Sequence, residues 1–232
     1  MKPLPLDQWQ AYLVAQARSP LGETPIAAPC AVTISRETGA GASVVAQKVI
    51  EILESQHVGN VLYPWAAFDR ELVTKALTDH SLPATLAHYM PEDAQSQIID
   101  LVEELLGAHP PSWTLLQQTN ETIKRLANRG NVILIGRGSH LVTTHLPHVF
   151  HVRLVAPVTS RVSHVMQREH LPALAAAEYV QKGDKAKARY IRRNFGSRVQ
   201  DPLQFHLTIN TGLVGFQKAA EIIARAVSLV SG

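Results

Sequence analysis

Residues 32–46 read VTISRETGAGASVVA, and this stretch decides the fold. It opens with a β-branched run typical of a buried strand, passes through a turn of glycine and alanine at 39–42, and continues with helical apolar spacing. A strand, a loop of small residues and a helix N-terminus make an anion cradle, because the loop N–H groups and the positive end of the helix dipole converge. We therefore expect a phosphate to bind here.

The loop departs from the usual phosphate-binding pattern at two positions. That pattern reads G-x-x-x-x-G-K-S/T, and it places Gly41 at the second glycine and Ser43 at the final hydroxyl. Arg36 stands at the first glycine and Ala42 at the lysine, so the main cation of such a loop is missing from its usual place. The competing interpretation is a tight strand-to-helix turn whose small residues serve only close packing.

Strand-like and helix-like segments alternate along the rest of the chain. Strands are expected at 31–35, near 61–63, and at 131–135, 149–155 and 207–210, and helices at 43–55, 115–127, 158–169, 173–194 and 216–230. Further helices are expected near the N-terminus, after Asp69 and over 92–106, and the three prolines of 19–29 indicate a linker. The alternation predicts an α/β fold with a parallel sheet covered by helices on both faces.

The composition fits one α/β domain that binds a small anion. The 232 residues suffice for a sizeable core, and 46% hydrophobic against 18% charged residues is ordinary for a globular protein. The net charge of +3 suits an anionic ligand, but it is spread over the whole domain and gives little support to nucleic-acid binding. The single cysteine excludes a disulfide within the chain, and no apolar run has the length of a membrane span. A cytoplasmic protein is expected.

Arginines form two further candidate sites. Arg137 follows the strand at 131–135 between two glycines, at the edge where parallel sheets bind ligands, and its planar guanidinium suits a bidentate contact with phosphate. The second candidate site consists of arginines on two expected helices, namely Arg161, Arg168, Arg189 and Arg192. A mobile arm that carries such cations can offset the charge that spreads onto a transferred phosphoryl group. The alternative for this second group is a solvated basic helix face.

Several motifs, taken in order, carry a resemblance to a known family. They are TISRE at 33–37, GAG at 39–41, FDREL at 68–72, GRG at 136–138, HVRLVAP at 151–157, VMQRE at 165–169, DKAKARY at 184–190, NFG at 194–196, DP at 201–202 and INT at 209–211. With this order and spacing, residues 31–230 resemble the cytidylate kinase-like family of P-loop proteins.

The resemblance implies a P-loop NTPase fold, in which a parallel sheet lies between helices in three α/β/α layers. An N-terminal helix and Pro-rich linker would occupy residues 1–29, and the kinase-like domain residues 30–232. Within that domain, the resemblance implies a helical monophosphate-binding insertion at about 69–128 and an arginine-bearing lid at about 168–200.

The resemblance also implies roles for particular residues. The loop residues Gly39, Ala40, Gly41, Ala42 and Ser43 would hold the phosphates of ATP, and Ser43 would also contact Mg²⁺. The acceptor would meet Asp69, Lys75, Arg137 and Asp184. Charge on the transferred group would be offset by Arg36, Arg161, Arg168, Arg189 and Arg192.

These roles imply ATP-dependent phosphoryl transfer to a nucleoside monophosphate or a similar small phosphate acceptor. A second interpretation, a non-catalytic nucleotide-binding or regulatory module on the same fold, follows from the missing loop lysine. Gly138 also stands where cytidylate kinases have an aspartate, and no acidic residue ends the strand at 131–135, which leaves Ser43 or Glu37 to hold magnesium. The arginines of the lid favour the kinase interpretation. Oligomeric state stays open.

Overall fold

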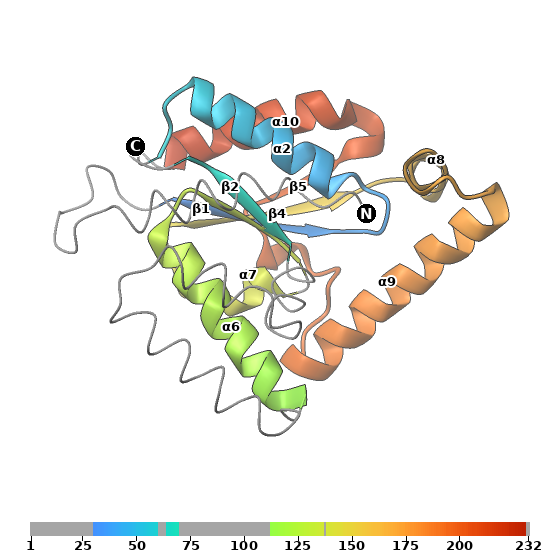
Figure 1. Cartoon of the computed structure of the whole chain (residues 1–232), viewed down its shortest axis with the longest axis horizontal. Helices are drawn as coiled ribbons and strands as arrows, with labels where there is room; N and C mark the ends of the chain where they lie inside the picture. The colour runs from blue at the N-terminus through green and yellow to red at the C-terminus, as the bar shows by residue number, and fades with distance from the viewer. Residues whose placement is uncertain (1–29, 60–63, 70–111, 137, 231–232) are drawn as a thin grey trace, which may run out of the picture.

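A parallel sheet lies at the centre of the protein, for which the computed structural model describes residues 30–59, 64–69, 112–136 and 138–230 (Figure 1). Its strands are β1 (Ala31–Arg36), β2 (Ala66–Asp69), β3 (Val132–Ile135), β4 (Val149–Val155) and β5 (Leu207–Asn210). They lie in the order β2-β3-β1-β4-β5, and every neighbouring pair is parallel. The α/β fold expected from the sequence is confirmed.

Helices cover both faces of this sheet. One face carries α2 (Ala42–Ser55) and α10 (Thr211–Val230), and the other carries α6 (Ser112–Arg129) and α7 (Ser139–Val142) (Figure 1). Two further helices, α8 (Val158–Glu169) and α9 (Ala173–Phe195), follow β4, and α9 runs obliquely beside the sheet toward α6 (Figure 1).

Most elements lie within a few residues of their predicted bounds, whereas three short ones were not predicted. These are β2, α7 and the 3₁₀ helix η1 (Pro202–Gln204), which are too short to show a periodic apolar pattern. In addition, α10 begins at Thr211 and contains a non-helical residue, Gly215. The strand expected near 61–63 and the helices expected near the N-terminus, after Asp69 and over 92–106 lie outside the described residues.

Apolar strand residues alternate between two cores. Val32 and Ile34 of β1 pack with α2 and α10, whereas Ala31 packs with α6 on the opposite face. This alternation follows from the period of two in a strand. Because β1 lies third of the five strands and is buried on both faces, its carboxyl end is fixed firmly where the predicted phosphate loop, residues 37–41, begins.

The face that carries α6 and α7 also contains buried histidines. His151 of β4 pairs in register with Thr33 of β1, and its Nδ1 lies 2.8 Å from the Thr33 hydroxyl. Its backbone N–H donates to Nδ1 of His206 over 2.8 Å. Burial, followed by the neighbouring His206 and His140, lowers the pKa of His151 from 6.5 to about 4. Burial likewise lowers the pKa of His140 to about 4.

These shifts predict a loss of stability in mild acid. Each histidine is neutral in the folded protein but binds a proton below pH 6.5 once unfolded, so the free energy of unfolding falls as pH drops from about 6.5 to about 4. The slope reaches at most about 1.4 kcal/mol per pH unit for each histidine. We expect His151→Gln to make this slope shallower in urea unfolding, while His145→Gln, at an exposed turn position, leaves it unchanged. Equal slopes for the wild type and His151→Gln contradict this account.

Candidate functional site

The loop between β1 and α2 has the geometry of an anion-binding turn. It contains two left-handed glycines, Gly39 (φ 87°) and Gly41 (φ 82°). A Cβ atom at Gly41 would lie 2.3 Å from the ring of Phe216, so only glycine fits there. The first turn of α2 leaves its backbone N–H groups without partners in the helix, and they point out over this loop.

A cavity of about 410 Å³ opens over the loop. Its size lies within the range of about 300–1,000 Å³ that small-molecule sites occupy. The residues that line it come from β1, the loop, α2, β2, α8 and α9, and they are Arg36, Glu37, Thr38, Gly39, Gly41, Ala42, Ser43, Asp69, Arg168, Tyr179, Lys182, Gly183, Ala186 and Lys187. Four of these side chains are cationic and two are acidic, so the cavity favours an anionic ligand.

Arg36 lines this cavity and is held in place by Asp69. It stands at the first-glycine position of the usual loop, and its Nη2 lies 3.2 Å from Oδ2 of Asp69. Asp69 is the last residue of β2 and is almost fully buried. A charged hydrogen bond to a buried carboxylate holds the guanidinium in a defined position beside the loop. The structure thus brings together two predicted site residues that are 33 positions apart.

Arg161 and Asp184 join the phosphate loop to α9. Arg161 is buried and donates to the carbonyl oxygens of Thr38 (3.2 Å) and Ala156 (2.9 Å) and to the Asp184 carboxylate, while Nε lies 3.4 Å from Glu37. Asp184 also accepts the backbone N–H of Thr38 over 2.7 Å. Neither side chain lines the cavity. Their predicted contacts with reactants stay predictions; in the structure the pair binds the loop at Thr38, and we call it the Arg161–Asp184 brace.

Hydrogen bonds keep the Asp184 carboxylate of this brace charged. Burial alone would raise the pKa of the Asp184 carboxyl, but the hydrogen bonds from the Thr38 N–H and from Arg161 outweigh it and hold the pKa below its ordinary value. Asp184 therefore stays ionised, and the attachment of α9 to the loop persists across the neutral range.

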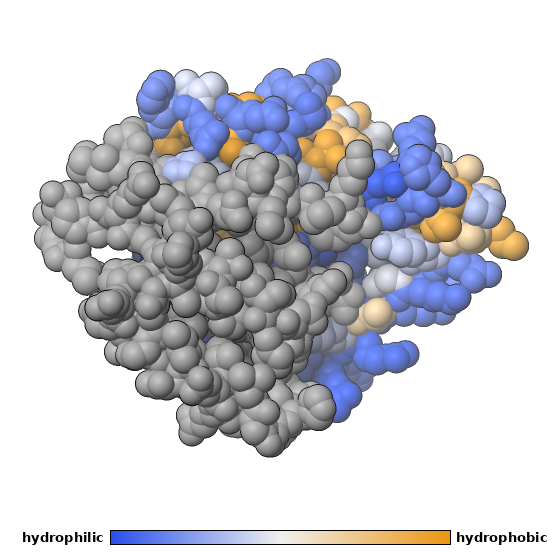
Figure 2. All heavy atoms as spheres, in the orientation of Figure 1, coloured by the Kyte–Doolittle hydropathy of each residue, from blue (hydrophilic) through white to orange (hydrophobic). Residues whose placement is uncertain are grey.

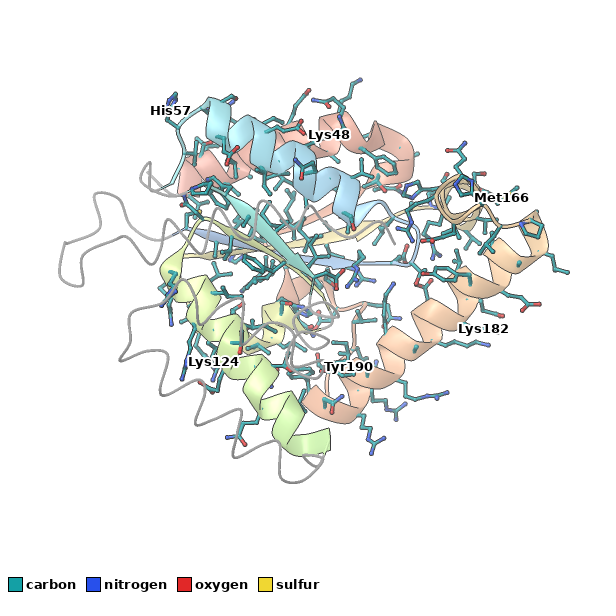
Figure 3. All side chains as sticks on the ribbon, in the orientation of Figure 1. Lys48, His57, Lys124, Met166, Lys182 and Tyr190 are labelled. Atoms are coloured by element: carbon teal, nitrogen blue, oxygen red, sulfur yellow. The ribbon has the colours of Figure 1, made fainter. Side chains whose placement is uncertain are left out.

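The cations that α9 brings to the cavity are lysines. Lys187 Nζ lies 2.6 Å from the Thr38 hydroxyl. Lys182, five residues earlier, also lines the cavity, but its side chain is 77% exposed and its Nζ pairs with Glu178 over 3.0 Å (Figure 3). The predicted lid residues Arg189 and Arg192 are exposed. The surface in the region of α9 is mostly hydrophilic in this view (Figure 2). The spacing of the five α9 residues that line the cavity, 179, 182, 183, 186 and 187, is that of one helix face, a signal that could have identified the lysines from the sequence.

The remaining predicted site residues divide into two groups. Arg168 of α8 lines the cavity and is paired with Glu169, its neighbour in the chain, over 2.6 Å. Ser43, in the first turn of α2, also lines the cavity, whereas the loop residue Ala40 is buried. Lys75 and Arg137 lie outside the described residues.

The described residues contain neither a candidate membrane span nor a cluster of metal-binding side chains. No helix among them is long and apolar enough to cross a bilayer. In those same ranges, no three histidine, cysteine, aspartate or glutamate side chains gather closely enough to hold a metal ion by themselves.

Solved structures resemble this chain to different degrees. An uncharacterized protein from Eubacterium ventriosum ATCC 27560 superimposes with a TM-score of 0.60 at 17% sequence identity, over 85% of this chain and 98% of that one. Shikimate kinase from Acinetobacter baumannii in complex with shikimate gives 0.45 at 13% identity, over 86% and 93%. The Mycobacterium tuberculosis APS kinase CysC in complex with AMPPNP and APS gives 0.44 at 16% identity, over 86% and 97%.

The family comparison covers most of the chain. No curated protein matches the sequence. The family model described as the cytidylate kinase-like family matches residues 31–213, from the first strand to just beyond the last. This match confirms the resemblance seen in the sequence motifs, and the chain belongs to the cytidylate kinase-like family.

Proposed function

We propose that this chain transfers the γ-phosphoryl group of ATP to a nucleoside monophosphate or a similar small phosphate acceptor. The observation that carries the proposal is the cavity over the phosphate loop, where cations from three different elements face the backbone N–H groups of one turn. Phosphoryl transfer asks little covalent chemistry of a protein, because catalysis comes from holding the reactants in line and offsetting their charge. The cavity is built for both tasks.

Lys187 takes the place of the missing loop lysine in this proposal. Its ammonium group lies against the loop at Thr38, although its backbone belongs to α9. A cation delivered by α9 reaches the phosphates only while that helix is attached to the loop, so charge neutralisation depends on the Arg161–Asp184 brace. Arg36 supplies a second charge from the opposite wall, in a position fixed by Asp69.

The lining of the cavity fits magnesium as well as a triphosphate. Mg²⁺ takes hydroxyl, carboxylate and phosphate oxygens, and Ser43, Asp69 and Glu37 all line this cavity. One oxygen of Glu37 already accepts the Ala156 N–H over 3.1 Å, and Oδ2 of Asp69 pairs with Arg36, which makes the Ser43 hydroxyl the first candidate ligand. When bound, the ion would neutralise phosphate charge. The protein's own groups would orient the triphosphate through the loop N–H groups.

A coupled assay with ATP, Mg²⁺ and each of CMP, dCMP, UMP, AMP and GMP tests the proposal. We expect turnover with at least one acceptor, and a fall in kcat of about 100-fold for Lys187→Met, because one charged contact to the transferred group is lost. Lys185→Met, on the same helix but exposed and outside the cavity, serves as the matched control and should keep its kcat. Turnover that Lys187→Met leaves intact would contradict the role of this lysine.

The second candidate is a nucleotide-binding module without catalysis. The missing loop lysine favours it, since the one fixed cation of the usual loop is absent. It predicts that AMPPNP raises the melting temperature while no acceptor in the panel is phosphorylated. If AMPPNP leaves the melting temperature unchanged, both candidate functions are contradicted.

The brace generates a separate prediction about binding. Asp184→Asn removes the charge that holds the Thr38 N–H and Arg161, so we expect the free energy of unfolding to fall by about 1–3 kcal/mol and AMPPNP to bind more weakly. Urea unfolding and calorimetric titration measure the two effects. Glu51→Gln, exposed on α2, is the control and should change neither quantity. Unchanged AMPPNP affinity in Asp184→Asn would show that the loop does not depend on α9.

A further inference from the structure

Arg153 occupies an unusual position on β4. Its neighbours Val152 and Leu154 pack with α2 and α10, so its own side chain points to the opposite face of the sheet. In register, it lies between Ser35 of β1 and Thr208 of β5. Only 6% of its surface is exposed. A guanidinium group is therefore held near the carboxyl ends of the strands, on the face away from α2.

Arg153 is the one buried or half-buried arginine of the described chain without a carboxylate partner. Arg36 has Asp69, Arg168 has Glu169, and Arg161 has two such partners. The Nη1 atom of Arg153 is fully buried and donates no hydrogen bond within the described residues. Its guanidinium carbon lies 5.7 Å from the ring centre of Phe205, a cation–π contact that leaves the N–H donors unused.

This arrangement is costly unless a ligand uses it. Burial lowers the pKa of Arg153, and the carboxylates of Glu37 and Asp184 oppose that shift from a distance. Arginine stays protonated in proteins, so a full positive charge is kept from water without a direct partner. Unsatisfied buried polar groups in native structures call for a specific explanation, and a site that awaits an anion is one.

A second unsatisfied group lies against the same aromatic ring. His140 of α7 packs on Phe205 with ring centres 4.5 Å apart, is 1% exposed, and has a buried Nδ1 without a hydrogen bond among the described residues. Arg153 and His140 therefore both contact the Phe205 ring, one through its guanidinium and the other through its imidazole. Neither residue is among those that line the cavity over the phosphate loop.

The hydrogen bonds of Gln204 determine which ring nitrogen of His140 carries the proton. The Gln204 Nε2 donates to the carbonyl oxygen of Arg198 and to the Asp201 carboxylate, both of which only accept. Its Oε1 must therefore accept from His140 Nε2, at 3.2 Å. With its pKa lowered to about 4, His140 is neutral, and its Nδ1 then carries a lone pair. A ligand here meets a charged donor from Arg153 and an acceptor from His140.

We propose that Arg153 and His140 form a subsite for the acceptor, one that binds an oxyanion with an adjacent hydroxyl. The anionic oxygen accepts from Arg153 Nη1, and the hydroxyl donates to His140 Nδ1. Phosphate monoesters of sugars and hydroxy acids both have this chemistry. The inference rests on the proposed function, because it describes the acceptor of that reaction, and it adds that the acceptor carries an anionic group bound away from the phosphate loop.

The test is an NMR titration of the full chain labelled with ¹⁵N-histidine, with the phosphate loop saturated by AMPPNP. The probes are inorganic phosphate, glycolate, and acetate, which lacks the hydroxyl of glycolate. We expect the His140 Nδ1 resonance to shift with phosphate or glycolate, and the two arms distinguish a phosphate acceptor from a hydroxy acid. Acetate should bind without that shift. A His140 resonance that no probe moves, while AMPPNP binds, overturns the inference.

Variants separate this role from a structural one. Arg153→Met removes an unpaired buried charge, so we expect its melting temperature to be unchanged or higher while the anion binds at least about tenfold more weakly. Arg125→Met, exposed on α6, is the control and should bind as the wild type does. A lower melting temperature with unchanged anion binding would make Arg153 a structural residue and overturn the inference.

The outcomes also distinguish this inference from the proposed function. Failure of AMPPNP to bind contradicts the proposed function. The phosphate and glycolate titrations without nucleotide still report on His140 in that case, and they decide the subsite independently.

Discussion

The attachment of α9 to the phosphate loop is the constraint on which the site depends. One carboxylate, that of Asp184, accepts the Thr38 N–H of the loop and the guanidinium of Arg161, which in turn binds the Thr38 carbonyl oxygen. The loop between β1 and α2 is thereby held on the same rigid unit as the helix that carries Lys187. Because the carboxylate is kept ionised by these contacts, the geometry does not rely on a bound ligand.

In the proposed function, this brace compensates for the missing lysine of the loop. The usual loop carries its cation within the turn, so charge and backbone donors are positioned together. Here the turn retains the glycines and the helix N-terminus, while the charges come from the end of β1, from α8 and from α9. Because the cations come from several elements, they neutralise phosphate charge only when those elements are correctly placed. A lid that moves one of them can regulate such a site.

The sequence predicted the sheet, the loop and the long helices because each has a strong local pattern. It did not predict β2, whose four residues show no periodicity, and so it did not foresee that Asp69 would end a strand beside Arg36. Local patterns also could not distinguish an arginine that is exposed on a helix from one that is buried and holds the loop in place. Arg161 and Arg189 are both arginines on helices, yet one is buried behind the loop and the other is exposed. Burial and tertiary contacts decide such roles, and neither is encoded in spacing alone.

The most direct measurement is a crystal structure of the chain with AMPPNP and Mg²⁺. The account predicts that the β- and γ-phosphates lie within hydrogen-bond distance of the N–H groups of Gly41 and Ala42, with Lys187 Nζ and the Arg36 guanidinium on their oxygens, and that Asp184 still accepts the Thr38 N–H. A triphosphate bound elsewhere, or bound to the loop with α9 detached and Lys187 in solvent, would contradict it.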